Sequence, residues 1–181
     1  MTTKAMTTKI PVFVSAPTDL NRKQRLSYDR IIHLLERENL DRRALGRSDY
    51  PTDYPLKEVV MIARRCAGGI ILGYSQAVAP KLIVKPGVPV KAGQKKRTPE
   101  KNAKFPTPWN NLEAGILFSL RLPLMVFRED GISGGVFDVG VTDLFVNRLP
   151  IGRISSEDEK QIVFALQIWA ARVREHYRKW E

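Results

Sequence analysis

Cysteine and histidine are scarce in this chain of 181 residues. Cys66 is the single cysteine, so the chain can form no internal disulfide and offers neither a cysteine-based zinc site nor a CxxC redox pair. The two histidines, His33 and His176, fall in segments expected to be helical, without acidic or cysteine companions at ligand spacing. We therefore expect no metal site.

Long hydrophobic runs are missing as well. No stretch approaches the roughly 18 consecutive apolar residues that a membrane-spanning helix needs. The first ten residues, MTTKAMTTKI, lack the apolar centre of a signal peptide. Together with the lone cysteine, these absences lead us to expect a cytoplasmic protein that does not enter a membrane.

Sequence motifs of two common enzyme classes are also absent. The chain has no GxSxG element for a serine nucleophile. The glycine-rich stretch GISGGVFD (131–138) follows an expected strand but opens no expected helix, so it does not fit a phosphate-binding loop. We interpret it as a turn.

Acidic residues are nearly absent from residues 81–104. This segment holds eight Lys or Arg residues against Glu100, so it carries +7 of the net charge of +11. Such a run could attract nucleic acid or an acidic protein through its cations. Apart from Phe105 at its border it lacks aromatic residues, which disfavours base stacking. A solvated loop, or a lid over an anionic nucleotide, agrees equally well with this composition.

Apolar runs and amphipathic segments alternate along the rest of the chain. This alternation predicts one α/β domain over residues 10–181, with a mostly parallel central sheet covered by helices on both faces. Residues 1–9 are expected to form a flexible leader, and the proline-rich, basic segment 76–107 a long loop with at most a short strand at 81–85. The expected strands cover 10–17, 68–75, 122–129 and part of 142–149; the expected helices cover 22–39, 55–67, 108–121 and a last segment capped by Ser156 with Glu159.

Glu113 stands out on the helix expected at 108–121. At about 100° per residue it falls in the middle of an apolar stripe formed by Trp109, Leu112, Ile116, Leu117 and Leu120. A carboxylate there is costly unless it is paired or functional, and burial would raise its pKa. The alternative is that Glu113 pairs with an arginine or caps backbone amides.

The position of this helix favours a functional role. In a parallel sheet the loops at the carboxyl ends of the strands form the ligand-binding rim, and here those loops are 15–21, 74–109 and 128–138. Trp109 offers a stacking surface one turn from Glu113, and a helix N-terminus attracts anions such as phosphate. The combination indicates a nucleotide pocket.

The stretch PWNNLEAG (108–115), the apolar strand after it and EDGISGGVFD (129–138) resemble TIR-like domains and the related nucleoside 2-deoxyribosyltransferases. The turn VSAP (14–17) is similar to the one that ends the first strand in these families. The resemblance covers roughly residues 10–150. It implies a flavodoxin-like three-layer domain with a catalytic glutamate on the helix that follows the long loop.

Enzymes of these families cleave or exchange the N-glycosidic bond between a base and ribose or deoxyribose. The resemblance therefore implies that Glu113 is catalytic, that Trp109 stacks on the base or walls the pocket, and that NAD or a related nucleotide is the substrate, with no cofactor required. The remaining residues that it implies in substrate binding are Ser15, Ala16, Pro17, Asp19, Asn110 and Asp138.

The resemblance also bears on biological context. Bacterial relatives of this kind act in defence against phage, where they deplete NAD or make a nucleotide signal, so a separate effector protein and self-association are implied partners. Two alternatives remain open: a non-catalytic nucleotide-binding module, and a nucleoside or nucleotide deoxyribosyltransferase or hydrolase.

Overall fold

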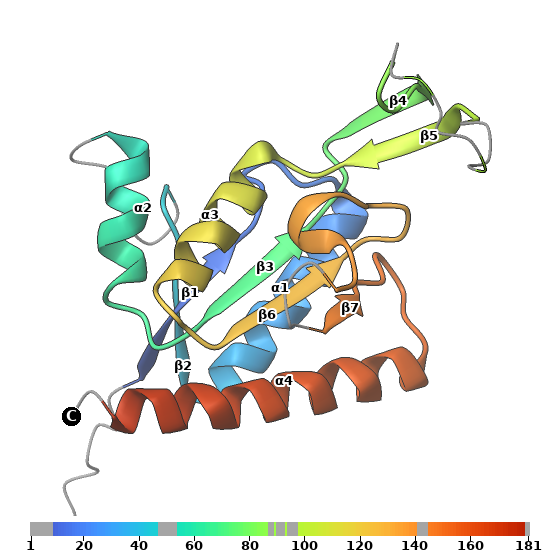
Figure 1. Cartoon of the computed structure of the whole chain (residues 1–181). Coiled ribbons are helices and arrows are strands. Elements are labelled where there is room, and N and C mark those ends of the chain that lie inside the picture. The colour runs from blue at the N-terminus through green and yellow to red at the C-terminus, as the bar shows by residue number, and fades with distance from the viewer. Residues whose placement is uncertain are drawn as a thin grey trace, which may run out of the picture.

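A five-stranded parallel sheet forms the centre of the molecule (Figure 1). The computed structural model describes residues 9–46, 54–86, 89, 93, 98–140 and 145–179. The strands are β1 (Ile10–Ser15), β2 (Leu40–Arg43), β3 (Gly69–Gly73), β6 (Leu124–Arg128) and β7 (Val146–Arg148), in the order β2-β1-β3-β6-β7, and every neighbouring pair is parallel. This is the predicted flavodoxin-like arrangement.

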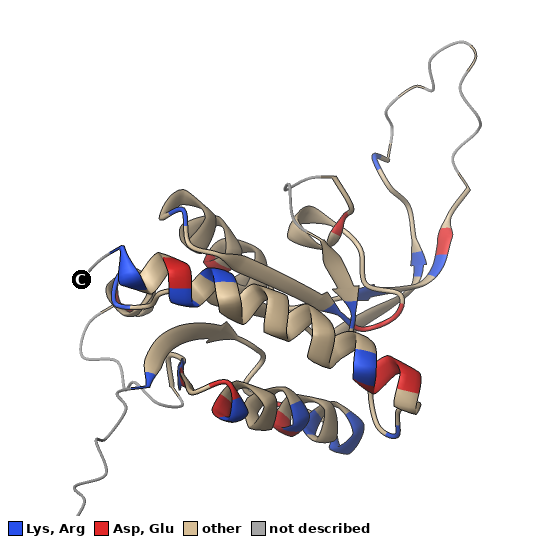
Figure 2. Ribbon diagram, turned by 90° about the horizontal axis from the view of Figure 1, so that it is seen from below, with Lys and Arg blue, Asp and Glu red and all other residues tan. Residues whose placement is uncertain are grey.

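Four helices cover the two faces of the sheet. Helices α1 (Arg22–Arg37) and α4 (Ser156–Arg178) pack on one face, and α2 (Pro55–Ala63) and α3 (Pro108–Ser119) pack on the other. Each face of the sheet has its own hydrophobic core, because successive side chains of a strand point to opposite faces. In β1, Val12 and Val14 face α1 and α4, while Phe13 faces α2 and α3. Figure 2, seen from below, shows α4 running across the molecule in front of the sheet.

The helix starts follow local capping chemistry. Asn21 and Gln24 form a reciprocal capping box at α1, and Pro108 occupies the first turn of α3, where its missing N–H costs nothing. The predicted cap of the last helix is wrong by one residue. Ser155, not Ser156, caps α4 by accepting a hydrogen bond of 3.0 Å from the backbone N–H of Asp158.

Two glycines of β3 bring neighbouring elements close to the sheet. A Cβ added at Gly69 would lie 2.7 Å from Cδ1 of Leu117 on α3. A Cβ at Gly73 would collide with the ring of Phe137 in the short 3-10 helix η1 (Gly135–Phe137). The absence of side chains at these positions therefore lets α3 pack tightly at the amino end of β3 and η1 at its carboxyl end.

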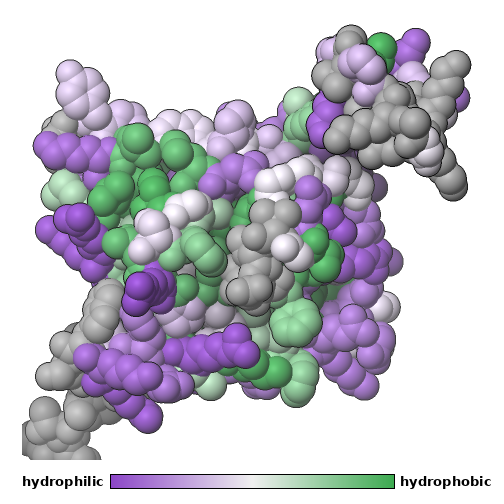
Figure 3. All heavy atoms as spheres, viewed as in Figure 1, coloured by the Kyte–Doolittle hydropathy of each residue, from purple (hydrophilic) through white to green (hydrophobic). Residues whose placement is uncertain are grey.

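The buried face of α3 differs from the predicted stripe. It consists of Asn110, Ala114 and Leu117, so Glu113 lies at its edge and not at its centre. Leu112 is 44 % exposed, because the apolar residues on that side of α3 face outward. Leu112 and three other exposed apolar residues contribute to the hydrophobic area that Figure 3 shows over α2 and α3, namely Leu56, Met61 and Phe118.

The basic segment is not the long loop that its composition predicted. Strands β4 (Ala77–Leu82) and β5 (Glu100–Phe105) form an antiparallel hairpin that projects from the carboxyl end of the sheet (Figure 1). Both strands are mostly exposed, so they lack the apolar alternation by which a half-buried strand is recognised.

Some expectations concern residues that the structure does not describe. The expected leader falls outside the described residues except for Lys9, and so does part of the segment 142–149, in which β7 occupies 146–148. Within the described residues, no helix combines the length and hydrophobicity needed to cross a bilayer.

Candidate functional site

The end of β1 and the start of α3 are joined by buried side chains. Asn110 is 1 % exposed, and its Nδ2 donates a hydrogen bond of 2.8 Å to Oγ of Ser15, the last residue of β1. Thr107 caps α3 by accepting from the Asn110 backbone N–H, and its hydroxyl also donates to Asn110 Oδ1 at 3.0 Å. The helix N-terminus is therefore held in place against the carboxyl end of the sheet.

Glu113 lies one turn further along α3 and lines a cavity of about 330 Å³. Trp109 and Thr107 of the same helix region form one wall. Residues that follow β1 and β2 form the other, namely Ala16, Pro17, Thr18, Leu45 and Gly46. The cavity thus opens at the carboxyl ends of the strands, where ligands bind in sheets of this topology.

Burial raises the pKa of Glu113 from 4.5 to about 7. A hydrogen bond with the Ser15 side chain opposes this effect by favouring the ionised form. The same Ser15 hydroxyl oxygen accepts from Asn110, which leaves its proton free to interact with the carboxylate. Asn110 therefore helps to hold the Ser15 hydroxyl that lowers the pKa of Glu113.

The alternative in which Glu113 pairs with an arginine is not what the structure contains. Among the described residues Glu113 has no ion-pair partner, and the influences on its pKa are burial and Ser15 alone. Of the described residues that line the cavity, Glu113 is also the single titratable one. In the part of the chain that the structure describes, the carboxylate therefore faces the cavity without a compensating cation.

The other predicted site residues divide into two groups. Ser15, Ala16, Pro17, Trp109 and Asn110 gather around Glu113 as the resemblance implied, although Ser15 and Asn110 lie buried beneath the cavity. Trp109 remains 43 % exposed, which leaves much of its indole accessible to a ligand.

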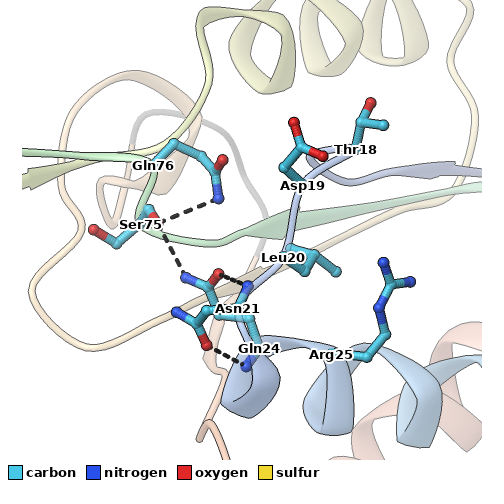
Figure 4. Close-up of a pocket in the computed structure, with 8 residues that line it drawn as sticks. All are labelled: Thr18, Asp19, Leu20, Asn21, Gln24, Arg25, Ser75 and Gln76. Carbon is cyan, nitrogen blue, oxygen red and sulfur yellow. Dashed lines mark hydrogen bonds between the residues drawn. The ribbon is translucent and has the colours of Figure 1, made fainter.

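The two aspartates lie away from this cavity. The Asp138 carboxylate accepts a hydrogen bond of 2.7 Å from the Gly134 backbone N–H, so it closes the turn before η1. Asp19 is exposed and lines a second depression, of about 460 Å³, on the α1 side of the sheet (Figure 4). Their predicted contact with substrate remains a prediction.

The second depression has polar walls held by hydrogen bonds. Gln24 of α1 donates to the Ser75 carbonyl at 3.0 Å, and Gln76 donates to the same oxygen at 3.2 Å (Figure 4). Thr18 lines both this depression and the Glu113 cavity. The two hollows therefore adjoin on either side of the loop that follows β1.

The sequence interpretation missed Glu129, a buried carboxylate directly after β6. It is 5 % exposed and accepts hydrogen bonds from Gln24 Nε2 at 2.9 Å and from the Ser75 backbone N–H at 3.1 Å. Lys104 of β5 forms an ion pair with it at 3.3 Å. Glu129 thus joins α1, β3 and the hairpin at the rim, whereas Glu113 has no ion-pair partner in the described part of the chain.

No group of three or more potential metal ligands occurs among the described residues. A scan of the sequence against protein-family models finds no match, and a search of curated proteins finds none either. The cavity at Glu113 is therefore the feature of the molecule that points to a function.

Proposed function

We propose that this protein cleaves or transfers the N-glycosidic bond of NAD or a related nucleotide, with Glu113 as the catalytic carboxylate. The observation that carries the proposal is the position of Glu113: a carboxylate with no counterion among the described residues, facing a cavity of about 330 Å³ beside an accessible indole. A carboxylate of this kind suits a reaction in which positive charge develops on a bound sugar.

The chemistry follows from the groups in the cavity. When the bond between the sugar C1′ and the base nitrogen breaks, its electron pair leaves with the base and C1′ becomes oxocarbenium-like. Ionised Glu113 stabilises this cation electrostatically or attacks it covalently. Water or a hydroxyl group then adds to C1′ and releases a proton, which completes hydrolysis, transfer or cyclisation.

The absence of a second titratable group among the described lining residues favours a substrate with a cationic leaving group. The base of an ordinary nucleoside must be protonated as it departs, which calls for a general acid. Nicotinamide in NAD is bound to ribose as a pyridinium cation, and it becomes neutral by taking the bonding electrons. A single carboxylate therefore suffices for NAD, and Trp109 offers a surface on which a flat ring can stack.

The proposal is tested by incubating wild type and Glu113→Gln with NAD, nicotinamide mononucleotide and a panel of nucleosides, with products identified by mass spectrometry. We expect free nicotinamide from NAD with wild type and none above background with the variant. Glu100→Gln, an exposed carboxylate on β5, is the matched control and should retain activity.

The other outcomes distinguish the alternatives. Release of bases from nucleosides but not from NAD would favour a deoxyribosyltransferase or nucleoside hydrolase. Binding without turnover of any substrate would indicate a nucleotide-binding module. If the product is a cyclised or transferred ADP-ribose, a role as a signal for a separate effector in phage defence becomes the next hypothesis to test.

A further inference from the structure

The hairpin formed by β4 and β5, here called the basic arm, is not part of the Glu113 cavity. It projects from the rim of the sheet, and Figure 2 shows cations on both of its strands. All residues of its two strands are exposed or half-buried except Ala103, which is buried. An exposed two-stranded hairpin gains little stability from burial. The residues on its surface are therefore not needed to form the hydrophobic core.

Two lysines of the basic arm stand directly opposite each other. Lys81 of β4 and Lys101 of β5 are cross-strand partners in the antiparallel register. Like charges in this arrangement are destabilising, since their side chains leave the strands only about 5 Å apart. Neither lysine has an ion-pair partner among the described residues. Among the described residues, the pair is therefore a local concentration of positive charge that no ion pair neutralises.

Lys104 provides a contrast within the same hairpin. It forms an ion pair with Glu129 and donates to the Asp130 backbone carbonyl at 2.9 Å, which attaches the base of the basic arm to β6. The charge of Lys104 is thus used for structure, while Lys81 and Lys101 are exposed. The sequence of this segment is also strongly basic, because residues 81–104 contain eight Lys or Arg residues and a single acid, Glu100.

We propose that the basic arm is a docking surface for nucleic acid, which contacts the phosphate backbone through Lys81 and Lys101. Regularly spaced phosphates can approach two adjacent ammonium groups at once, and each contact releases condensed counterions. Lysine attracts phosphate as a point charge, and aromatic residues for stacking are lacking over 81–104. Binding through phosphate contacts therefore depends strongly on salt and little on base sequence.

The test measures binding of wild type and Lys81→Gln/Lys101→Gln to a single-stranded RNA and a duplex DNA of equal length, by fluorescence anisotropy over a salt series. Two lost phosphate contacts reduce the slope of log K against log salt by about 1.8 for the duplex DNA and by about 1.4 for the single strand. The affinity ratio of wild type to variant should therefore fall about tenfold for the duplex and about sevenfold for the single strand between roughly 50 and 200 mM salt.

The matched control neutralises two exposed cations of α4, Lys160→Gln/Arg172→Gln, and lowers the net charge by the same amount. It should retain the wild-type salt slope. Glu113→Gln should bind nucleic acid like wild type, so the outcome is independent of the proposed enzymatic activity. Circular dichroism of each variant checks that the fold is retained.

Three outcomes would overturn the proposal. The first is a lack of nucleic-acid binding by wild type at low salt. The second is an equal loss of affinity in the basic-arm and α4 variants, which would show that net charge alone is responsible. The third is tighter binding of poly-glutamate than of either nucleic acid, which would assign the basic arm to an acidic protein partner.

Discussion

Replacing Glu113 by glutamine should make the protein more stable above neutral pH but not below about pH 4.5. The pKa of Glu113 is 4.5 in an unfolded chain and about 7 in the folded protein, because burial disfavours the ionised carboxylate. Between these values the folded protein retains a proton that the unfolded chain has released. Stability contributed by this group is therefore fully present at low pH and is lost as pH rises towards 7.

The magnitude follows from the difference between the two pKa values. A shift of 4.5 to about 7, at about 1.4 kcal/mol per pH unit, gives a penalty of up to about 3 kcal/mol in wild type above neutral pH. Glutamine resembles the protonated acid in shape and never ionises, so Glu113→Gln avoids this penalty. The stability difference between the two proteins should therefore grow from near zero to this value as the pH rises.

Urea unfolding of both proteins, monitored by circular dichroism at a series of pH values, measures the difference directly. Glu100→Gln on β5 reports the general effect of removing one negative charge from a protein with a net charge of +11. A stability difference between wild type and Glu113→Gln that stays constant across the series would refute the reasoning, because the carboxyl group would then titrate alike in both states.

Three further expectations follow from contacts around the rim. Ser15→Ala removes the hydrogen bond that favours ionised Glu113, so the acid limb of the pH–rate profile should move to higher pH; an unchanged profile would contradict the assigned contact. Glu129→Gln replaces a buried, ion-paired acceptor and should cost about 3 kcal/mol in urea unfolding, whereas a neutral effect would argue against its structural role. Gly73→Ala places a methyl group against the ring of Phe137 and should cost about 1–3 kcal/mol by thermal unfolding; a stabilised variant would show that η1 moves freely.

The layered fold could be predicted because its central strands are short apolar runs separated by amphipathic helices. β3, GIILG, is buried along its whole length, which is the pattern of a strand covered on both faces. The basic arm could not be predicted in the same way. Strands β4 and β5 include Pro80 and Asn102 and are mostly exposed, so their pairing depends on register across a long connection and not on apolar alternation.

The candidate site was predictable in part. Helical periodicity identified Glu113 and Trp109, which do line one cavity. The predicted stripe was nevertheless off centre, because periodicity cannot tell which side of α3 meets the sheet and which forms the exposed apolar area. Glu129 was missed because its partners, Gln24, Ser75 and Lys104, are distant in sequence and converge only at the rim.

The measurement that tests the central claim most directly is the rate of nicotinamide release from NAD by wild type and by Glu113→Gln across the neutral pH range. The carboxylate must be ionised to stabilise a cationic sugar, so the wild-type rate should rise with pH through about 7, the pKa of Glu113. The glutamine variant should show no activity above background at any pH. A variant that releases nicotinamide at the wild-type rate would contradict the claim.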